Sequence, residues 1–124
     1  MQAVHTLHTD DPEEVKKQIA MFIGKHGQPE AFLSGENGDV RMQDFYDQCK
    51  SLMDEDVLQL RFKHFTGEHP TANAMAFWLA GKFLGTGVVP QQFILRAKSN
   101  IQPASILIYN TGKGEQHSFI FLTK

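Results

Sequence analysis

The segment 63–70, which reads KHFTGEHP, concentrates side chains suited to chemistry. Lys63, Glu68 and His69 can each donate, accept or transfer a proton, which is what general acid–base catalysis requires. Pro70 at the end of the segment and Thr71 directly after it are typical of a helix start, and they predict a helix over 71–84. Because a helix N-terminus presents free N–H groups, we expect this loop to favour anions or carbonyl oxygens.

Simpler interpretations of the same segment stay open. Lys63 and Glu68 can form a structural ion pair that braces the loop, since paired charges are often structural. A metal site needs three converging ligands, and His64 and His69 lack the i, i+4 spacing that places two ligands on one helix face. We therefore predict no metal and no cofactor.

The helix predicted over 71–84, TANAMAFWLAGKFL, is apolar around nearly its whole circumference. Only Asn73 and Lys82 are strongly polar in its interior. A helix of this kind is buried on all sides, and three alanines spaced four residues apart give it one face that permits close approach. A chain this short rarely encloses such a helix, so we expect it to lie between this chain's sheet and a second body.

Strand and helix signals alternate along the chain. Short apolar or alternating runs predict strands, and apolar stripes at i, i+4 and i+7 predict helices. In the first helix the predicted stripe is Val15, Ile19, Phe22 and Ile23, with a capping aspartate and Pro12 at its start and Gly27 after its end. The expected strands are 3–9, 31–34, 57–62, 105–109 and 117–122, with 91–98 as a short strand or extended loop, and the expected helices are 12–26, 42–53 and 71–84. This alternation indicates one α/β domain over 1–124, with a mixed, mostly parallel sheet, helices on both faces and a C-terminal hairpin.

In such sheets, functional sites form on the loops that leave the carboxyl ends of the strands. The three candidate loops are 34–39, 63–69 and 110–116, and all contain glycine and polar residues. Gly112, Lys113 and Gly114 could cradle a phosphate, but the glycine run and following helix of a P-loop are absent, and a hairpin turn also explains them.

Composition excludes several classes of function. With 124 residues, 41% of them hydrophobic, the chain suits one globular domain. A net charge of −2, and ten phenylalanines without interleaved basic residues, argue against nucleic-acid binding. The single cysteine, Cys49, falls on the inner side of a predicted helix, which favours a buried apolar role over a nucleophile. No signal peptide or membrane-spanning run is visible, so we expect a cytoplasmic protein without a membrane partner.

Four motifs follow one another along the whole chain. They are Asp11-Pro12-Glu13 before the turn Gly27-x-Pro29-Glu30, the segment from Ser34 to Gln43-Asp44, Lys63-x-x-x-Gly67-Glu68 before a helix rich in small residues and Gly87-Val88-Val89-Pro90, and Asn110-Thr111-Gly112-Lys113-Gly114. Their succession resembles the C-terminal half of a β-ketoacyl-acyl-carrier-protein synthase, a condensing enzyme of the thiolase fold. The third motif is similar to the family's Lys-x-x-x-Gly-His, and the fourth to its Asn-Ser-Phe-Gly-Phe-Gly-Gly turn.

The resemblance also implies where the site residues lie. In the family, a cysteine on the N-terminal half takes the acyl group, and two histidines on this half assist decarboxylation and stabilise the enolate. The place of the first histidine falls here on Glu36 or, with a one-residue gap, on Asn37, and that of the second on Glu68. We therefore take Glu36, Lys63 and Glu68 as the catalytic positions, and Asn37, His69, Thr111, Gly112, Lys113 and Gly114 as the substrate-binding positions that the resemblance implies. An ionised glutamate cannot donate to a developing oxyanion, so the chain lacks both histidines as well as the nucleophile.

The resemblance implies an acyltransferase-like domain that is linked to fatty acid or polyketide synthesis and is inactive alone. Its implied partner is an N-terminal thiolase half or a synthase subunit, in a homo- or heterodimer, with acyl carrier protein as a further partner. A second hypothesis is a non-catalytic subunit like the chain-length factors, which shape an acyl tunnel beside an active synthase. A third is an unrelated α/β binding module, which would be favoured if no apolar helix face is exposed.

Overall fold

The computed structural model describes residues 2–35, 40–54, 57–62, 72–96, 103–112 and 116–123. The elements are β1 (Gln2–His8), α1 (Pro12–His26), β2 (Ala31–Ser34), α2 (Val40–Lys50), β3 (Leu58–Arg61), α4 (Ala72–Thr86), η1 (Gln91–Phe93), β4 (Ile94–Arg96), β5 (Ser105–Gly112) and β6 (Gln116–Thr123). Their order confirms the predicted alternation, and the ambiguous stretch after α4 forms a short 3-10 turn followed by a strand. Helix α2 begins and ends earlier than predicted.

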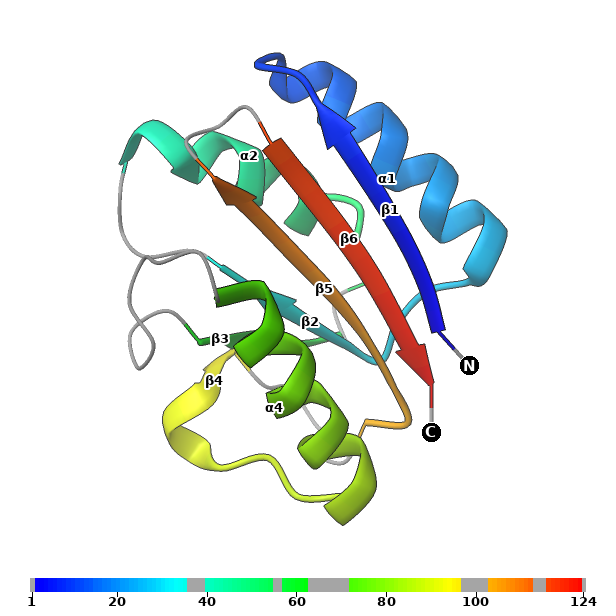
Figure 1. Ribbon diagram of the computed structural model, residues 1–124, viewed down its shortest axis with the longest axis vertical. Helices are drawn as coiled ribbons and strands as arrows, with labels where there is room; N and C mark the ends of the chain where they lie inside the picture. Colours follow the sequence, from blue (N-terminus) through cyan, green and yellow to red (C-terminus); the bar gives the residue numbers. More distant parts are fainter. Residues whose placement is uncertain are drawn as a thin grey trace.

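The six strands form one mixed sheet in the order β1-β6-β5-β2-β3-β4 (Figure 1). Strand β2 lies parallel to β3 and to β5, whereas β1–β6, β5–β6 and β3–β4 are antiparallel pairs. The α/β class and the C-terminal hairpin are therefore confirmed. The expectation of a mostly parallel sheet does not hold for the pairings, because β1 joins the outer edge of the hairpin and β4 folds back on β3. Strands β1, β2, β3 and β5 nevertheless run in one direction.

Helix α1 forms where its end signals predict it. The side chain of Asp11 accepts a hydrogen bond from the backbone N–H of Glu13 at 3.0 Å, which caps the first turn. At the other end, Gly27 adopts a φ of +94°, a backbone conformation that residues other than glycine rarely adopt. The buried stripe of the helix consists of Val15, Ile19, Phe22 and Ile23, the residues that the spacing predicts.

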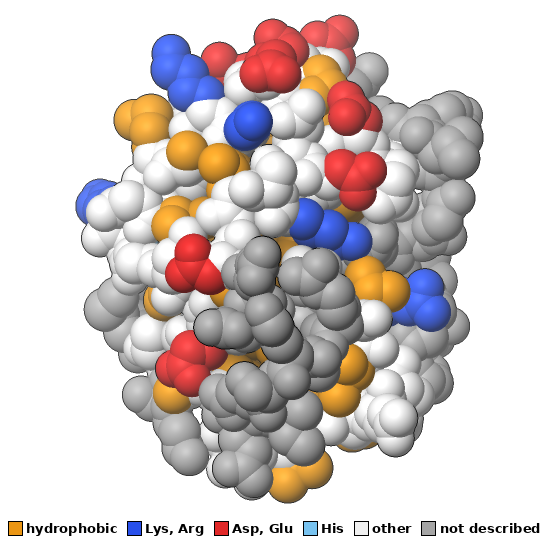
Figure 2. All heavy atoms as spheres, turned by 180° about the vertical axis from the view of Figure 1, so that it is seen from behind, with side chains coloured by type: hydrophobic (Ala, Val, Ile, Leu, Met, Phe, Trp, Pro, Cys, Tyr) orange, Lys and Arg blue, Asp and Glu red, His pale blue; other side chains and the backbone are white. Residues whose placement is uncertain are grey.

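Helices cover both faces of the sheet, as predicted. Helices α1 and α2 pack on one face, where they bury Phe32, Leu107, Tyr109, Phe119 and Phe121 of the strands. Helix α4 packs on the other face, over Leu33, Leu60, Ile106, Ile108, Ile120 and Leu122, with Val89 and Phe93 of the following turn beside it. Seen from the side opposite to α4, acidic and basic side chains lie among scattered hydrophobic ones (Figure 2).

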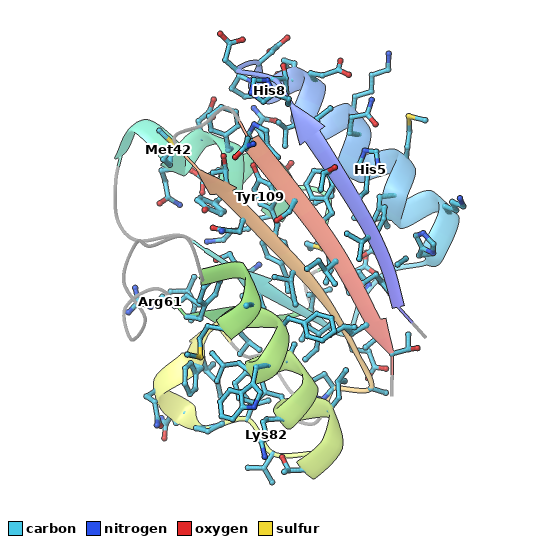
Figure 3. All side chains as sticks on the ribbon, in the orientation of Figure 1. His5, His8, Met42, Arg61, Lys82 and Tyr109 are labelled. Atoms are coloured by element: carbon cyan, nitrogen blue, oxygen red, sulfur yellow. The ribbon has the colours of Figure 1, made fainter. Side chains whose placement is uncertain are left out.

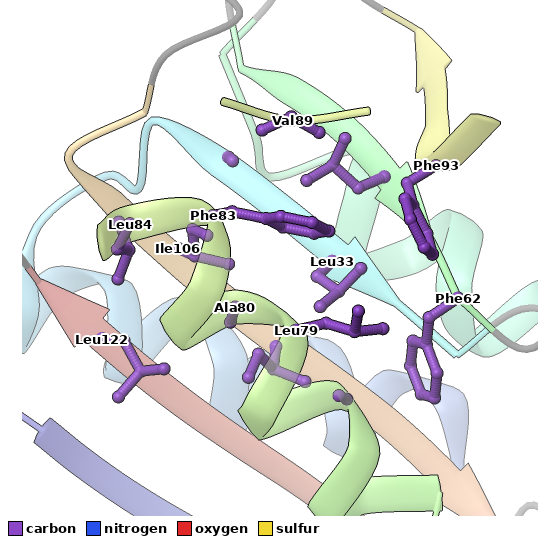
Figure 4. Packing of buried hydrophobic residues seen from close by; sticks show 14 of the residues in the cluster. Leu33, Phe62, Leu79, Ala80, Phe83, Leu84, Val89, Phe93, Ile106 and Leu122 are labelled. Atoms are coloured by element: carbon purple, nitrogen blue, oxygen red, sulfur yellow. The ribbon is translucent and has the colours of Figure 1, made fainter. Parts of the chain in front are cut away.

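Helix α4 buries only the side that faces the sheet. Ala76, Leu79, Ala80, Phe83 and Leu84 pack against the strands (Figure 4). On the remaining circumference the exposed fractions are 39% for Met75, 38% for Phe77 and 56% for Trp78. The expected burial on all sides is therefore not met within this chain, because α4 has the sheet on one side only. No described helix has the length and apolar character needed to cross a membrane.

Candidate functional site

The carboxyl ends of three neighbouring strands meet at one edge of the sheet. Strand β2 lies between β5 and β3 and is parallel to both, so the loops that follow these strands leave from the same edge (Figure 1). The Ser34 hydroxyl donates to the carbonyl of Leu60 at 3.4 Å. The N–H of Gly35 donates to the carbonyl of Tyr109 at 3.0 Å. These bonds join the three strand ends, as the prediction from the parallel pattern requires.

Most of the predicted site residues lie outside the described part of the chain. They are Glu36, Asn37, Lys63, His64, Glu68, His69, Lys113 and Gly114. Their roles stay predictions, and so does the choice between an ion pair and a catalytic pair for Lys63 and Glu68. What the structure contributes is the position of the strands that carry them, because β2, β3 and β5 end side by side.

Two predicted substrate-binding residues are described, Thr111 and Gly112 at the end of β5. Thr111 is 2% exposed, and its hydroxyl donates to the carbonyl of Gln116 at 2.9 Å, which closes the hairpin. Its backbone N–H approaches the Tyr46 hydroxyl at 3.4 Å. Gly112 pairs with Gln116 as the last pair of the β5–β6 ladder.

A buried polar network, which the sequence did not single out, lies under α2 beside this edge. Tyr109 on β5 is fully buried, and its hydroxyl lies 2.8 Å from Nδ1 of His117 on β6 (Figure 3). The other ring nitrogen of His117 lies 2.8 Å from the carbonyl of Thr9, between β1 and α1. The Tyr46 ring of α2 lies 5.2 Å from the Tyr109 ring, and the Phe45 ring lies 5.0 Å from the His117 ring.

The partners of His117 determine its tautomer. A backbone carbonyl only accepts hydrogen bonds, so Nε2 must carry the proton that is donated to Thr9. Nδ1 of the neutral ring is then an acceptor, and the Tyr109 hydroxyl donates to it. Both ring nitrogens are therefore occupied, which ties the hairpin to the junction between β1 and α1 and leaves His117 no free nitrogen for proton transfer.

Burial keeps the neighbouring acidic groups protonated. Desolvation raises the pKa of the Tyr109 phenol well above its ordinary range, the proximity of Cys49 and Tyr46 adds to this shift, and a hydrogen bond with Thr111 opposes it. Desolvation likewise raises the pKa of the Cys49 thiol. A thiol held protonated is a poor nucleophile, so Cys49 behaves as the buried apolar residue that its position predicts.

This polar network could not be predicted from the sequence, for a geometric reason. Tyr109 and His117 are eight residues apart, and only the hairpin register, which pairs Tyr109 with Phe119 and Thr111 with His117, places them on one face. His117 belongs to no recognisable sequence motif. The signal that could have indicated a shared face is the alternation of side chains along a strand. Leu107, Tyr109 and Thr111 face one side of the sheet, and the residues between them face the α4 side.

The described residues contain no group of three histidine, cysteine, aspartate or glutamate side chains that could hold a metal ion. Comparison with protein-family models, curated proteins and solved structures finds no match for this chain.

Proposed function

We propose that this chain is a β-ketoacyl-synthase-like half domain, inactive alone, that works against a second thiolase-like half in fatty acid or polyketide synthesis. The observation that carries the proposal is the uncovered apolar side of α4. In the fold that the motifs imply, two halves pack their inner helices between two sheets. Among the described α-helices, α4 lies on one sheet face and α1 and α2 on the opposite face, which suits that inner position.

The outer side of α4 has the character of a packing surface. Trp78, Met75 and Phe77 are substantially exposed there, and burying one large apolar side chain typically contributes about 1.5–3 kcal/mol. A Cβ built at Gly81 or Gly85 would meet no atom within 4 Å, so this stretch is open. Small residues on an open helix face let a second helix approach closely.

The geometry of the sheet edge supports the placement of the site. The loop that carries Glu36 follows β2, and the loop that carries Lys63 and Glu68 follows β3. A third loop, with Lys113, follows β5, and these three strands end side by side. In the proposal these loops line an acyl pocket that the partner half completes with its cysteine. Acyl carrier protein would then deliver the substrate to that pocket.

A second candidate, a non-catalytic subunit like a chain-length factor, is favoured by the described side chains under α2. Cys49 is buried, and both nitrogens of His117 are engaged in hydrogen bonds. Such groups do not offer a nucleophile or a free base. The unrelated binding module is disfavoured, because its distinguishing condition was the lack of an exposed apolar helix face.

The test is reconstitution. The chain is tagged at its C-terminus in the source cell, purified with its partner, and assayed for condensation of acyl and malonyl carrier protein. If the complex is active, Lys63→Ala abolishes condensation; unchanged activity would reject that role. An inactive chain bound beside an active synthase would instead support the chain-length-factor alternative. A chain that purifies without any synthase partner would reject both.

A further inference from the structure

The two edge strands of the sheet, β4 and β1, differ in how they are protected against pairing with another chain. Strand β4 is three residues long, ends in Arg96, and pairs with β3 through a register shift at Gln59 and Leu60. Strand β1 is seven residues long, reads QAVHTLH without lysine, arginine or proline, and pairs with β6 in an unbroken register. Short length, charge and bulges are the usual devices that stop an edge from pairing with another chain. The described strands place nothing beyond β1, and it has none of these devices.

An open groove of about 370 Å³ runs beside this edge, between β1 and α1. Its lining consists of Ala3, Val4 and His5 from the strand and Gln18, Met21, Phe22, Lys25 and His26 from the helix. Met21 is 62% exposed, so hydrophobic surface faces solvent on the helix wall. On the strand wall, Ala3 and His5 face α1, whereas the side chain of Val4 points to the opposite face of the sheet. No carboxylate belongs to this lining, whereas Lys25 and His26 supply basic groups at one end.

Rings form one wall of the groove. His5 lies on the α1 side of β1 (Figure 3), stacked on Phe119 with ring centroids 5.9 Å apart. The centroid of the Phe22 ring lies 6.2 Å from that of His5 and 4.6 Å from that of His26. These contacts fix the wall before any ligand binds, which lowers the ordering cost of binding.

We propose that β1 and α1 form a docking groove for an extended segment of another protein, which adds to the sheet as a strand along β1. Main-chain hydrogen bonds to the free edge would supply affinity, and alternate side chains would enter the groove. Because only every second side chain of an added strand faces the groove, the groove selects a segment whose groove-facing residues are apolar along the walls and acidic beside Lys25 and His26. The groove lies on the α1 side of the sheet, so the proposal does not depend on what covers α4.

The probe is a fluorescent peptide, Val-Thr-Val-Thr-Val-Thr-Glu-Thr-Glu, in which the valine and glutamate side chains share one face of the strand. It is titrated against the whole chain by anisotropy. We expect saturable binding that is at least about tenfold tighter than that of the same peptide with lysine in place of glutamate. Lys25→Glu should reverse this preference. Lys17→Glu, which changes an exposed residue of the same helix outside the groove, is the matched control and should leave it unchanged.

A second peptide, N-methylated at alternate residues, tests the strand geometry, because N-methyl groups remove the donors that a new strand needs. We expect this peptide to lose binding. Binding that survives N-methylation, an equal effect of Lys25→Glu and Lys17→Glu, or a lack of saturable binding would each overturn the proposal. A dimer of the chain alone that Val4→Lys dissociates would assign the edge to a second copy and would also overturn it.

Discussion

The hydroxyl of Tyr109 lies 2.8 Å from Nδ1 of His117, across the two strands of the C-terminal hairpin. Because His117 also donates to the carbonyl of Thr9, this pair connects the last strands of the chain to the start of its first helix. The contact spans more than a hundred residues of sequence and lies beside the edge where the candidate loops leave the sheet. It is a structural connection, and its strength can be measured.

Tyr109→Phe should lower the free energy of unfolding by about 1–3 kcal/mol. The substitution keeps the ring but leaves a buried acceptor on His117 without its donor. Urea unfolding followed by fluorescence measures the loss. Ser51→Ala, which removes an exposed hydroxyl bonded to the carbonyl of Gln48, is the control and should change the stability by less than about 0.5 kcal/mol. Equal small effects would show that the Tyr109–His117 bond contributes nothing.

Stability should fall at alkaline pH. The pKa of Tyr109 is raised in the folded state, so folding favours the protonated phenol, and the stabilisation is complete below the pKa of the unfolded chain. It is lost as the pH rises above about 10, where an unfolded tyrosine ionises, and Cys49 should begin a similar loss above about 8.5. Urea midpoints across this range measure the slope, which Cys49→Ala should reduce. A native chain whose buried tyrosine forms phenolate near pH 10 would contradict the assignment.

The two sides of α4 should respond differently to truncation. Leu79→Ala removes a side chain that is 9% exposed in the core against the sheet, and should cost about 2–5 kcal/mol. Trp78→Ala alters the outer side, and in the isolated chain it should cost less than about 1 kcal/mol, because the side chain is 56% exposed. The loss includes the packing of Lys82 over the indole ring. Thermal and urea unfolding of both variants measure the difference. A larger loss for Trp78→Ala would mean that this side is already covered.

The start of α1 offers a local test. Asp11→Ala should cost about 0.5–2 kcal/mol, because the first turn loses the carboxylate that accepts the Glu13 N–H. Asp10→Ala removes the same charge one residue earlier, outside the cap, and serves as the matched control. If both variants lose the same stability, the effect comes from charge near the helix terminus and not from the cap.

Local signals in the sequence predicted the elements that depend on local physics. Asp11, Pro12 and Gly27 determine where α1 begins and ends. The apolar character of α4 predicted burial on all sides, whereas Met75, Phe77 and Trp78 are exposed on the side away from the sheet. Strand partners were not predictable in this way, because alternation in β1 does not specify whether it pairs with a parallel strand or with β6. For the same reason the Tyr109–His117 pair could not be predicted, because only the register of the β5–β6 hairpin brings these two residues together.

For the candidate site, the sequence predicted where the loops lie but not how their side chains are arranged. The convergence of three loops at one sheet edge follows from the parallel pairing of β2 with β3 and β5, and the structure confirms it for the strand ends. The side-chain geometry of Lys63 and Glu68 is a property of loops outside the described residues. A loop conformation depends on contacts with distant elements, which spacing alone does not encode.

The central claim is that a synthase-like half covers the outer side of α4, and photo-crosslinking in the source cell tests it most directly. A photoreactive residue replaces Trp78, and another replaces Lys17 on the opposite side of the sheet as the control. We predict that position 78, and not position 17, yields a covalent adduct with a condensing-enzyme half that carries the family's cysteine. No adduct at position 78, or an adduct there with a protein unrelated to condensing enzymes, would contradict the account.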